Sequence, residues 1–449
     1  MPGYTDSRGH ALFTKSADAA AAFNAGMHSF VCWRTDTFAH LDSAVETDPD
    51  FALARLAKGW MLQTARSAAF KPAIDDLLQA SALLIDPADD RARAYFDSLD
   101  AAVNGRGVEA STIMEAMLAR HPTDLLAHRL VQFELFWNGR SAWMREISER
   151  AAPAWRDNMV DYGCFQSVRA FSFEETGDYD AADRCGRDAV EIDPHDCWGT
   201  HAIAHVLLMQ GKIEEGVGWL ERLSVNWEDA NQIGHHLWWH LCLFLLERGE
   251  HEHILDLLTT RIRNPKSPLV KAAPDATIDL QNVASLLMRL VLRGVDIADR
   301  WNIMADICAD RVHNHANAFS NAHDMMVLAG SGQFDQAEKL LESMRAFAVT
   351  GDGNLVTSYR VAGIAVCEAV LAHFRGDYAR VVELLAPVRH DMHLFGGSHA
   401  QRDVFYQILV YAACREGFNE LIPLYLADID RIGFDLVDQR TLYRDARVA

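Results

Sequence analysis

The chain has 449 residues, half of them hydrophobic, and its 63 acidic residues against 42 basic ones give a formal net charge of -21. No basic run interrupts this acidic excess, so nucleic acid and anionic membrane surfaces are not expected as partners. The start of the chain lacks a secretory pattern, and the apolar block at 237–246 is too short to cross a bilayer. We therefore expect a cytoplasmic protein that does not span a membrane.

The eight cysteines stand singly along the chain, and no two have the CxxC spacing of a structural zinc site or a redox motif. Buried, reduced thiols that pack as small hydrophobic groups are the simplest expectation for most of them. That usage agrees with a cytoplasmic location.

The composition predicts helices nearly everywhere, because helix-forming residues dominate and alternating β-branched runs are missing. Residues 1–40 are predicted to form an N-terminal cap, with an alanine-rich helix behind a polar lead. Farther along, proline breaks follow at 48–49, 86–87, 121–122 and 193–194. The fold class is therefore all-α.

Glycine turns divide the chain at a regular interval. Gly177, Gly211, Gly332 and Gly376 each open an amphipathic helix, and weaker versions of the same turn occur at Gly139, Gly249 and Gly417. A period of about 34 residues is typical of tetratricopeptide repeats, whose helix pairs stack into a curved solenoid. We predict one tetratricopeptide-like α-solenoid over 1–449, with irregular insertions. The largest insertion is a long loop at 264–276, where three prolines prevent a continuous helix.

The repeat register predicts which side chains line the concave groove of such a solenoid. Counting back from Gly211 and Gly249 brings two histidine pairs and two tryptophans to the groove, and counting back from Gly332 adds one more histidine. These residues are His201, His205, His236, His240, His323, Trp198 and Trp239. The neighbouring Trp238 falls on the opposite, core-facing stripe. Residues four apart share one face of a helix, so each histidine pair should form one wall of a pocket.

Converging imidazoles between aromatic side chains are typical of a small-molecule site, and histidine can transfer a proton near neutral pH. Two HxxxH pairs could also hold zinc, but Ala202 and Leu237 occupy the positions where the zincin motif has glutamate. We therefore expect a cofactor-free site, with zinc as the lesser alternative. A buried histidine that is only structural is the competing interpretation for each residue alone.

Four further residues are candidates for substrate binding or for orienting an imidazole. Asp279 lies on a helical stripe that points inward, although an aspartate there could equally cap the helix. Asp324 follows His323 and could orient its ring. His399 and Arg402 lie in the polar stretch 396–403, where Arg402 could bind a substrate carboxylate, or where the residues could simply form a helix cap.

The chain resembles the tetratricopeptide repeat protein 38 family over most of its length. The segments that carry the resemblance are DPDFALA at 48–54, HAIAHV at 201–206, HLWWH at 236–240, LLERG at 245–249, ASLLMRL at 284–290, NAHDMM at 321–326 and GGSHAQRD at 396–403. The resemblance implies a fold of divergent helical repeats and no particular activity.

Two functional hypotheses follow. The favoured one is a small-molecule-binding protein, and more specifically an enzyme of the hydrolase, lyase or isomerase type that uses the histidines as general acid and base. The alternative is a non-enzymatic scaffold that binds a partner protein or peptide in the groove. A homodimer that packs through part of the apolar groove is a third possibility.

Overall fold

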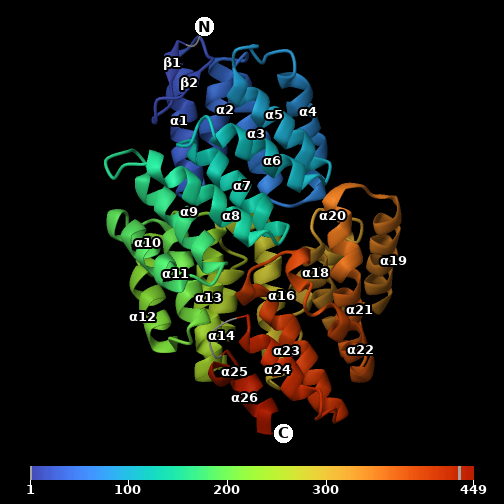
Figure 1. Ribbon diagram of the computed structural model, residues 1–449. Coiled ribbons are helices and arrows are strands. Elements are labelled where there is room, and N and C mark those ends of the chain that lie inside the picture. Colours follow the sequence, from blue (N-terminus) through green and yellow to red (C-terminus); the bar gives the residue numbers. More distant parts are fainter. Residues whose placement is uncertain (1–2, 433–435, 449) are drawn as a thin grey trace. The chain divides into compact units, whose positions relative to one another are not determined.

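The computed structural model describes residues 3–432 and 436–448, and these residues are almost entirely helical (Figure 1). In this described part of the chain, the only strands are β1 (Tyr4–Thr5) and β2 (Ala11–Leu12), which pair as a short antiparallel hairpin. The prediction of an all-α, tetratricopeptide-like fold is confirmed. The contacts between residues divide the chain into two compact units.

Unit 1 runs to Ile203 and adds Val225–Ile233 and Asp352–Leu355. Its helices pack mainly as consecutive pairs, α1 with α2, α3 with α4, α5 with α6 and α9 with α10. The bounds are α1 (Ala17–Val31), α2 (Thr37–Thr47), α3 (Ala52–Thr64), η1 (Ala68–Phe70), α4 (Lys71–Ser81), α5 (Asp90–Val103), α6 (Gly107–Leu118), α7 (Leu125–Trp137), α8 (Ser141–Ala151), η2 (Ala152–Ala154), α9 (Tyr162–Glu174) and α10 (Tyr179–Ile192). Helix α11 (Cys197–Met209) begins in unit 1 and ends in unit 2.

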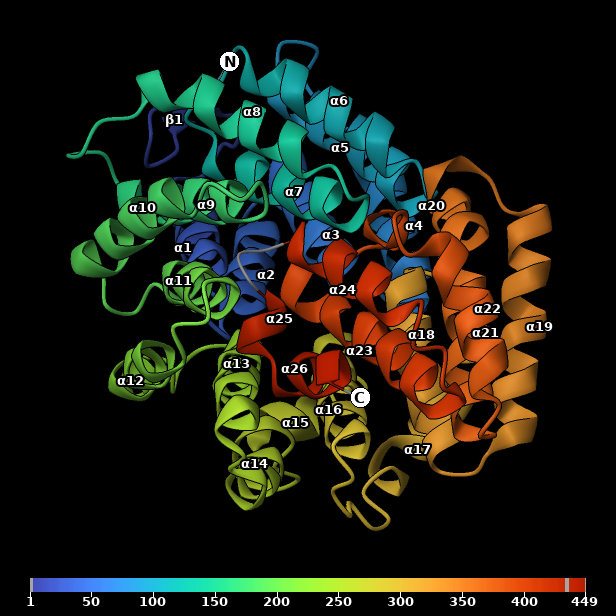
Figure 2. The same ribbon diagram turned by 60° about the horizontal axis from the view of Figure 1, so that its bottom comes forward.

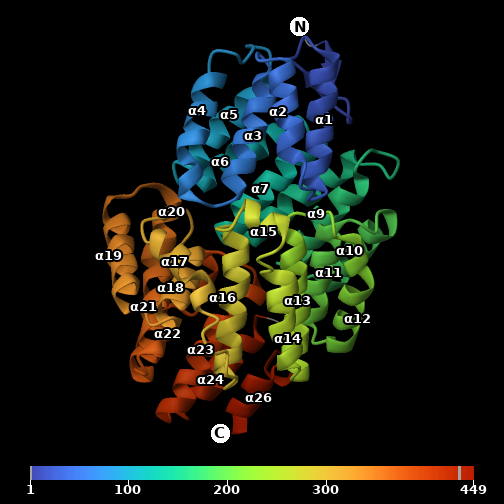
Figure 3. The same ribbon diagram turned by 180° about the vertical axis from the view of Figure 1, so that it is seen from behind.

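Unit 2 comprises Ala204–Ser224, Gly234–Gly351 and the chain from Val356 onward. Within it α13 and α16 run side by side (Figure 3), and α21 lies against both α19 and α22 (Figure 2). The bounds are α12 (Ile213–Leu223), η3 (Ser224–Asn226), α13 (Ile233–Arg248), α14 (His251–Leu257), η4 (Leu258–Ile262), α15 (Pro268–Ala272), α16 (Thr277–Leu292), α17 (Asn302–Asp310), α18 (Ala318–Gly330), α19 (Phe334–Thr350), α20 (Gly353–Ser358), η5 (Tyr359–Gly363), α21 (Ile364–Phe374), α22 (Tyr378–Val388), η6 (Met392–Phe395), α23 (His399–Glu416), α24 (Ile422–Asp430), α25 (Leu436–Gln439) and α26 (Thr441–Val448). Helix α20 begins in the segment that belongs to unit 1.

Three details differ from the sequence prediction. The stretch 264–276 is not wholly loop, because Pro268 starts the short helix α15, where its missing N–H needs no partner. The cap at 1–40 contains the β1–β2 hairpin ahead of its helix. Trp238, which was predicted to face the core, is only half-buried, and its ring contacts the Arg261 guanidinium; Trp239 is buried and packs against His236, beside the histidines as predicted.

One helical stretch, Gly353–Phe374, is long and apolar enough to cross a membrane by length and composition, and the sequence analysis did not single it out. In the structure 61% of its most apolar window is buried against other parts of the protein. Its apolar side chains therefore contribute to the core of the fold.

All seven glycines that mark turns in the sequence have a positive φ, namely Gly139, Gly177, Gly211, Gly249, Gly332, Gly376 and Gly417. At Gly177 the φ angle is 78° and a Cβ atom would meet nothing within 4 Å, so only the backbone conformation requires glycine there. The glycine turns predicted from the sequence therefore lie at helix ends.

We expect Gly177→Ala to lower the free energy of unfolding by about 1 kcal/mol, because alanine disfavours the left-handed conformation. Gly218→Ala is the matched control, since Gly218 lies inside α12, has no positive φ, and also leaves a Cβ free of contacts. That change should instead stabilise the protein by about 0.5–1 kcal/mol. Urea unfolding of both variants checks the contrast, and equal shifts in the same direction would refute it.

Candidate functional site

Three predicted histidines meet inside unit 2. His205 comes from α11, and His236 and His240 come from α13; they are 1%, 4% and 0% exposed. The ring centroids of His205 and His240 are 4.5 Å apart, and those of His236 and His240 are 4.7 Å apart. We call these three residues the imidazole cluster. The spacing of four along α13 brings His236 and His240 to one face, as the repeat register predicts.

His201 lies one turn before His205 on α11, within the part of that helix that belongs to unit 1. Its ring stacks on Trp198 with centroids 4.6 Å apart. The Trp198 indole N–H donates to Gln132 Oε1 at 3.1 Å, and the Arg129 guanidinium lies 4.9 Å from the centre of the same indole. Trp198 and His201 therefore belong to a buried group of aromatic rings around an arginine.

Hydrogen bonding fixes the proton on one nitrogen of His236. Its Nδ1 lies 2.7 Å from Asn282 Oδ1 on α16, and because an amide oxygen only accepts, Nδ1 carries the proton. Burial lowers the pKa of His236 to about 3, so the ring is neutral at pH 7. Its Nε2 therefore presents a lone pair, which can accept a hydrogen bond or bind a metal ion.

Arg289 adds a positive charge beside this group. It lies seven residues after Asn282 on α16, is 1% exposed, and its guanidinium is 5.7 Å from the centre of the Trp239 ring. The Trp239 ring in turn stacks on His236 at 4.9 Å. Burial lowers the pKa of Arg289 to about 10, which still leaves the side chain cationic at pH 7.

The acceptors of Arg289 are all neutral. Nη2 donates to the carbonyl of Ala400 at 2.8 Å, and Nη1 donates to the carbonyl and the hydroxyl of Ser285. Among the residues that the structure describes, no carboxylate lies within ion-pair distance of this guanidinium. The guanidinium is thus a buried cation that makes no ion pair in the described part of the chain, although the Asp403 carboxylate attracts it from beyond ion-pair distance.

Two buried N–H donors on α13 and α16 also have no acceptor within the described part of the chain. They are the indole N–H of Trp239 and the side-chain amide of Asn282, whose oxygen contacts His236. Buried donors are rarely left unsatisfied in folded proteins. We call Asn282, Trp239 and Arg289 the donor set.

Asp279 does not cap its helix, so that alternative is wrong. The N-cap residue of α16 is Ala276, and Asp279 lies fully buried in the first turn, with Oδ1 at 2.9 Å from Nδ1 of His235. The carboxylate therefore contacts a histidine that the sequence analysis overlooked, next to His236 in the chain.

The predicted pairing of Asp324 with an imidazole is wrong. Asp324 Oδ1 accepts from the Cys308 thiol at 3.5 Å, while His323 donates its Nδ1 proton to the Phe319 carbonyl at 2.8 Å. The His323 ring packs on Phe319 and Phe405, and burial lowers its pKa to about 4. His323 is thus a neutral histidine bonded to its own helix.

His399 and Arg402 lie in the first turn of α23, where Ser398 and Gln401 form a capping box, so the helix-cap interpretation is correct for this stretch. Arg402 donates to the Gly397 carbonyl. Both residues also line a cavity of about 260 Å³ together with Arg389, His390, His393, Asp403, Tyr406, Asp428, Ile429, Arg431, Ile432 and Leu436. They therefore line a cavity that includes no residue of the imidazole cluster.

The sequence analysis missed Asn282, Arg289 and His235. A signal for Arg289 is present in the sequence, because it interrupts the apolar run 284–290 and falls on the same face of α16 as Asn282. An arginine inside an apolar helical stripe either extends its guanidinium to the surface or needs partners for that guanidinium inside the protein.

Metal binding requires ligand atoms that converge. The nitrogens of the imidazole cluster lie within 4.8 Å of one another, which a zinc ion with bonds of about 2.0–2.1 Å could draw together. These three histidines could therefore supply three nitrogen ligands to one metal ion. The buried charge of Arg289 nearby, however, favours an anion over a second cation.

The comparisons with known proteins give no family. No family model matches the chain. One similar solved structure is the crystal structure of the APC/C hetero-tetramer Cut9-Hcn1, with a TM-score of 0.42 and 12% sequence identity over 96% of this chain and 76% of that chain. At this level of similarity, no role is transferred from that protein.

Proposed function

We propose that this helical-repeat protein binds a small anionic organic molecule, such as a carboxylate, at the donor set and the imidazole cluster of unit 2. The observation that carries the proposal is the fully buried Arg289 with only neutral acceptors. We propose in addition that the chain is related to the tetratricopeptide repeat protein 38 family, that it is cytoplasmic and that it forms a homodimer.

The energetics favour an anion. Burying a cation that has no partner is strongly unfavourable, and neutral carbonyls offset only part of the lost hydration. At 4 Å and an effective dielectric constant of 20, a carboxylate would contribute about 4 kcal/mol of Coulomb attraction to the guanidinium. The buried indole N–H of Trp239, whose ring lies beside the Arg289 guanidinium, is a second donor without an acceptor in the described part of the chain.

The imidazoles suit hydrogen bonding better than proton transfer. A base with the pKa of about 3 that burial gives His236 accepts protons poorly at pH 7. A bound anion would raise that pKa, so catalysis by the predicted histidines depends on the charge of the substrate. Binding is therefore the first activity to test, and hydrolysis, elimination or isomerisation of the bound molecule is the second.

Arg289→Met should weaken carboxylate binding by about 100-fold or more, because it removes the only cation of the donor set. Unliganded protein should be as stable as the parent or more so, since the substitution also removes a buried unpaired charge. The measurement is a thermal-shift screen with acetate, benzoate and succinate, followed by calorimetric titration of the best binder.

Arg261→Met is the matched control, because Arg261 is exposed and contacts Trp238 in the way that Arg289 contacts Trp239. Its affinity for the carboxylate should equal that of the parent. Equal affinities of the parent and folded Arg289→Met protein would refute the proposal. Tighter binding of zinc ions than of any carboxylate, lost on His240→Gln, would assign the cluster to a metal instead.

The competing function is a scaffold for a partner peptide. A peptide would need an open groove, whereas the donor set and the imidazole cluster are buried. Binding of C-terminal peptides, but not of free carboxylates, at a site that needs Arg289 would favour the scaffold.

A further inference from the structure

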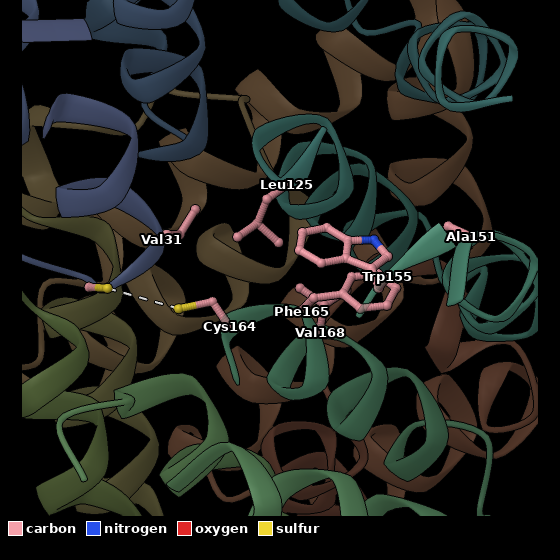
Figure 4. Packing of buried hydrophobic residues seen from close by; sticks show 8 residues of the cluster. Val31, Leu125, Ala151, Trp155, Cys164, Phe165 and Val168 are labelled. Atoms are coloured by element: carbon pink, nitrogen blue, oxygen red, sulfur yellow. Dashed lines mark hydrogen bonds between the residues drawn. The ribbon is translucent and has the colours of Figure 1, made fainter. Parts of the chain in front are cut away.

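Two cysteines of unit 1 lie side by side although they are 132 residues apart in the chain. The Sγ atoms of Cys32 and Cys164 are 3.9 Å apart (Figure 4). Both belong to an apolar cluster with Val31, Leu125, Trp155 and other buried residues, and they are 4% and 6% exposed. Cys32 follows the last residue of α1, and Cys164 lies in the first turn of α9.

A histidine and an acidic residue adjoin one thiol of this pair. Both ring nitrogens of His28 lie 3.8 Å from Cys32 Sγ, and its Nδ1 is also 2.8 Å from Asp161 Oδ1. Asp161 is held in place by Arg8, whose Nη1 donates to Oδ2 at 2.8 Å. The His28 side chain is 61% exposed, so it stands between Cys32 and solvent.

We propose that Cys32 and Cys164 form a peroxide-reactive dithiol, in which Cys32 is oxidised first and Cys164 then closes a reversible disulfide. This site lies in unit 1 and is independent of the ligand site proposed in unit 2. Closing the bond requires the two sulfurs to approach from 3.9 Å to about 2.05 Å.

The chemistry balances with a hydroperoxide as the oxidant. The Cys32 thiolate attacks the peroxide oxygen, so an S–O bond forms, the O–O bond breaks, and the alcohol leaves with a proton that His28 can donate. Cys164 then attacks the sulfur of the Cys32 sulfenic acid; the S–S bond forms, the S–O bond breaks, and the hydroxide leaves as water after taking up the Cys164 proton. Two thiols and one hydroperoxide thus give one disulfide, one alcohol and one water.

The surroundings make the two thiols unequal. The Cys164 hydrogen bond and the His28 side chain lower the pKa of Cys32 to about 6 against the opposing effect of burial, and the bond to Asp161 raises the pKa of His28 to about 10. The contact with Cys32 and burial raise the pKa of Cys164 well above its usual range. Cys32 is therefore the thiolate nucleophile at pH 7, and Cys164 is the resolving thiol.

The test treats the full-length protein with hydrogen peroxide and maps its cysteines by mass spectrometry without reduction. A Cys32–Cys164 disulfide should form in the parent and in Cys185→Ser, a control that removes another buried unit 1 cysteine. It should be absent in Cys32→Ser and Cys164→Ser, and the latter should accumulate a sulfenic acid at Cys32 that dione reagents label. His28→Gln should slow the reaction at pH 7 about tenfold.

If exposure alone decided which cysteine reacts with peroxide, Cys414 would be oxidised first, because it is the one cysteine of the described chain that is not buried. If Cys414 is oxidised first while Cys32 and Cys164 remain thiols, the proposal is overturned. It is equally overturned if folded His28→Gln protein, checked by circular dichroism, forms the disulfide at the parent rate. Reversal by dithiothreitol with recovery of both thiols completes the expected result.

Discussion

Lowering the pH from 7 to 5.5 should destabilise unit 2 by about 3 kcal/mol. Three buried histidines cause the effect: burial lowers the pKa of His236 to about 3 and the pKa values of His323 and His373 to about 4. Urea unfolding at pH 7.0, 6.0 and 5.5, followed by tryptophan fluorescence, measures the loss.

The sign follows from the order of protonation. An unfolded histidine has a pKa near 6.5, so between pH 6.5 and 4 the unfolded chain binds protons that the folded unit does not. Stability is fully present above pH 6.5 and falls as the pH drops toward the folded values, by about 1.2 kcal/mol per histidine at pH 5.5. Burial raises the pKa of Asp324, which works in the opposite sense and reduces the total.

His373→Phe isolates one of these contributions. The His373 ring packs against the aromatic rings of Phe374, Tyr378 and Tyr411, so phenylalanine suits this environment and removes the proton site. The variant should lose about a third of the pH dependence and be at least as stable as the parent at pH 7. An unchanged slope of stability against pH would contradict this assignment.

The fold could be predicted from the sequence where local rules decide it. The glycines of the helix turns need a left-handed conformation that other residues avoid, so the repeat pattern is visible in the chain itself. The π-helical turns η4 and η5 were not predictable, because a turn with one more residue than an α-helical turn leaves no distinct signal in composition. The hairpin β1–β2 was missed because strands of two residues have no measurable alternation.

The candidate site was likewise predictable only where the spacing of residues along one helix decides the contacts. His236 and His240 share a helical face, so their proximity follows from spacing alone. Asn282 and Arg289 come from another helix, and their contacts with His236 and Trp239 depend on how α13 and α16 pack. The half-exposure of Trp238 has the same origin: adjacent residues of a helix are about 100° apart, and tertiary packing decides which of the two faces is covered.

Arg289 and Arg91, two of the buried arginines, illustrate how the partners of a buried charge decide its role. Arg289 donates only to neutral acceptors, so its charge can still attract an anionic ligand. The charge of Arg91 in unit 1 is already paired with two carboxylates of the protein. Arg91 Nη2 lies 3.0 Å from Asp6 Oδ2, and its Nε donates to Asp124 Oδ2 at 3.0 Å. All three side chains are buried.

Arg91→Met should therefore lower the free energy of unfolding of unit 1 by about 3–5 kcal/mol, because two carboxylates would be left buried without their cation. Asp124 is the more sensitive of the two: it caps α7 by accepting from Ala127 and also accepts from Tyr95. Arg91 holds the pKa of Asp124 well below its usual range against the effect of burial. Urea unfolding at pH 7 measures the loss.

Arg93→Met is the control on the same helix. Arg93 is 52% exposed and lies 3.8 Å from Asp97, so its removal should cost at most about 0.5 kcal/mol. Acid should reduce the difference in free energy of unfolding between the parent and Arg91→Met. The stability that the Asp124 carboxylate contributes to the parent is lost as the pH falls from about 4 through its low folded pKa. Equal destabilisation by the two methionine substitutions would mean that the Asp6–Arg91–Asp124 group does not hold the N-terminal hairpin to α5 and α7.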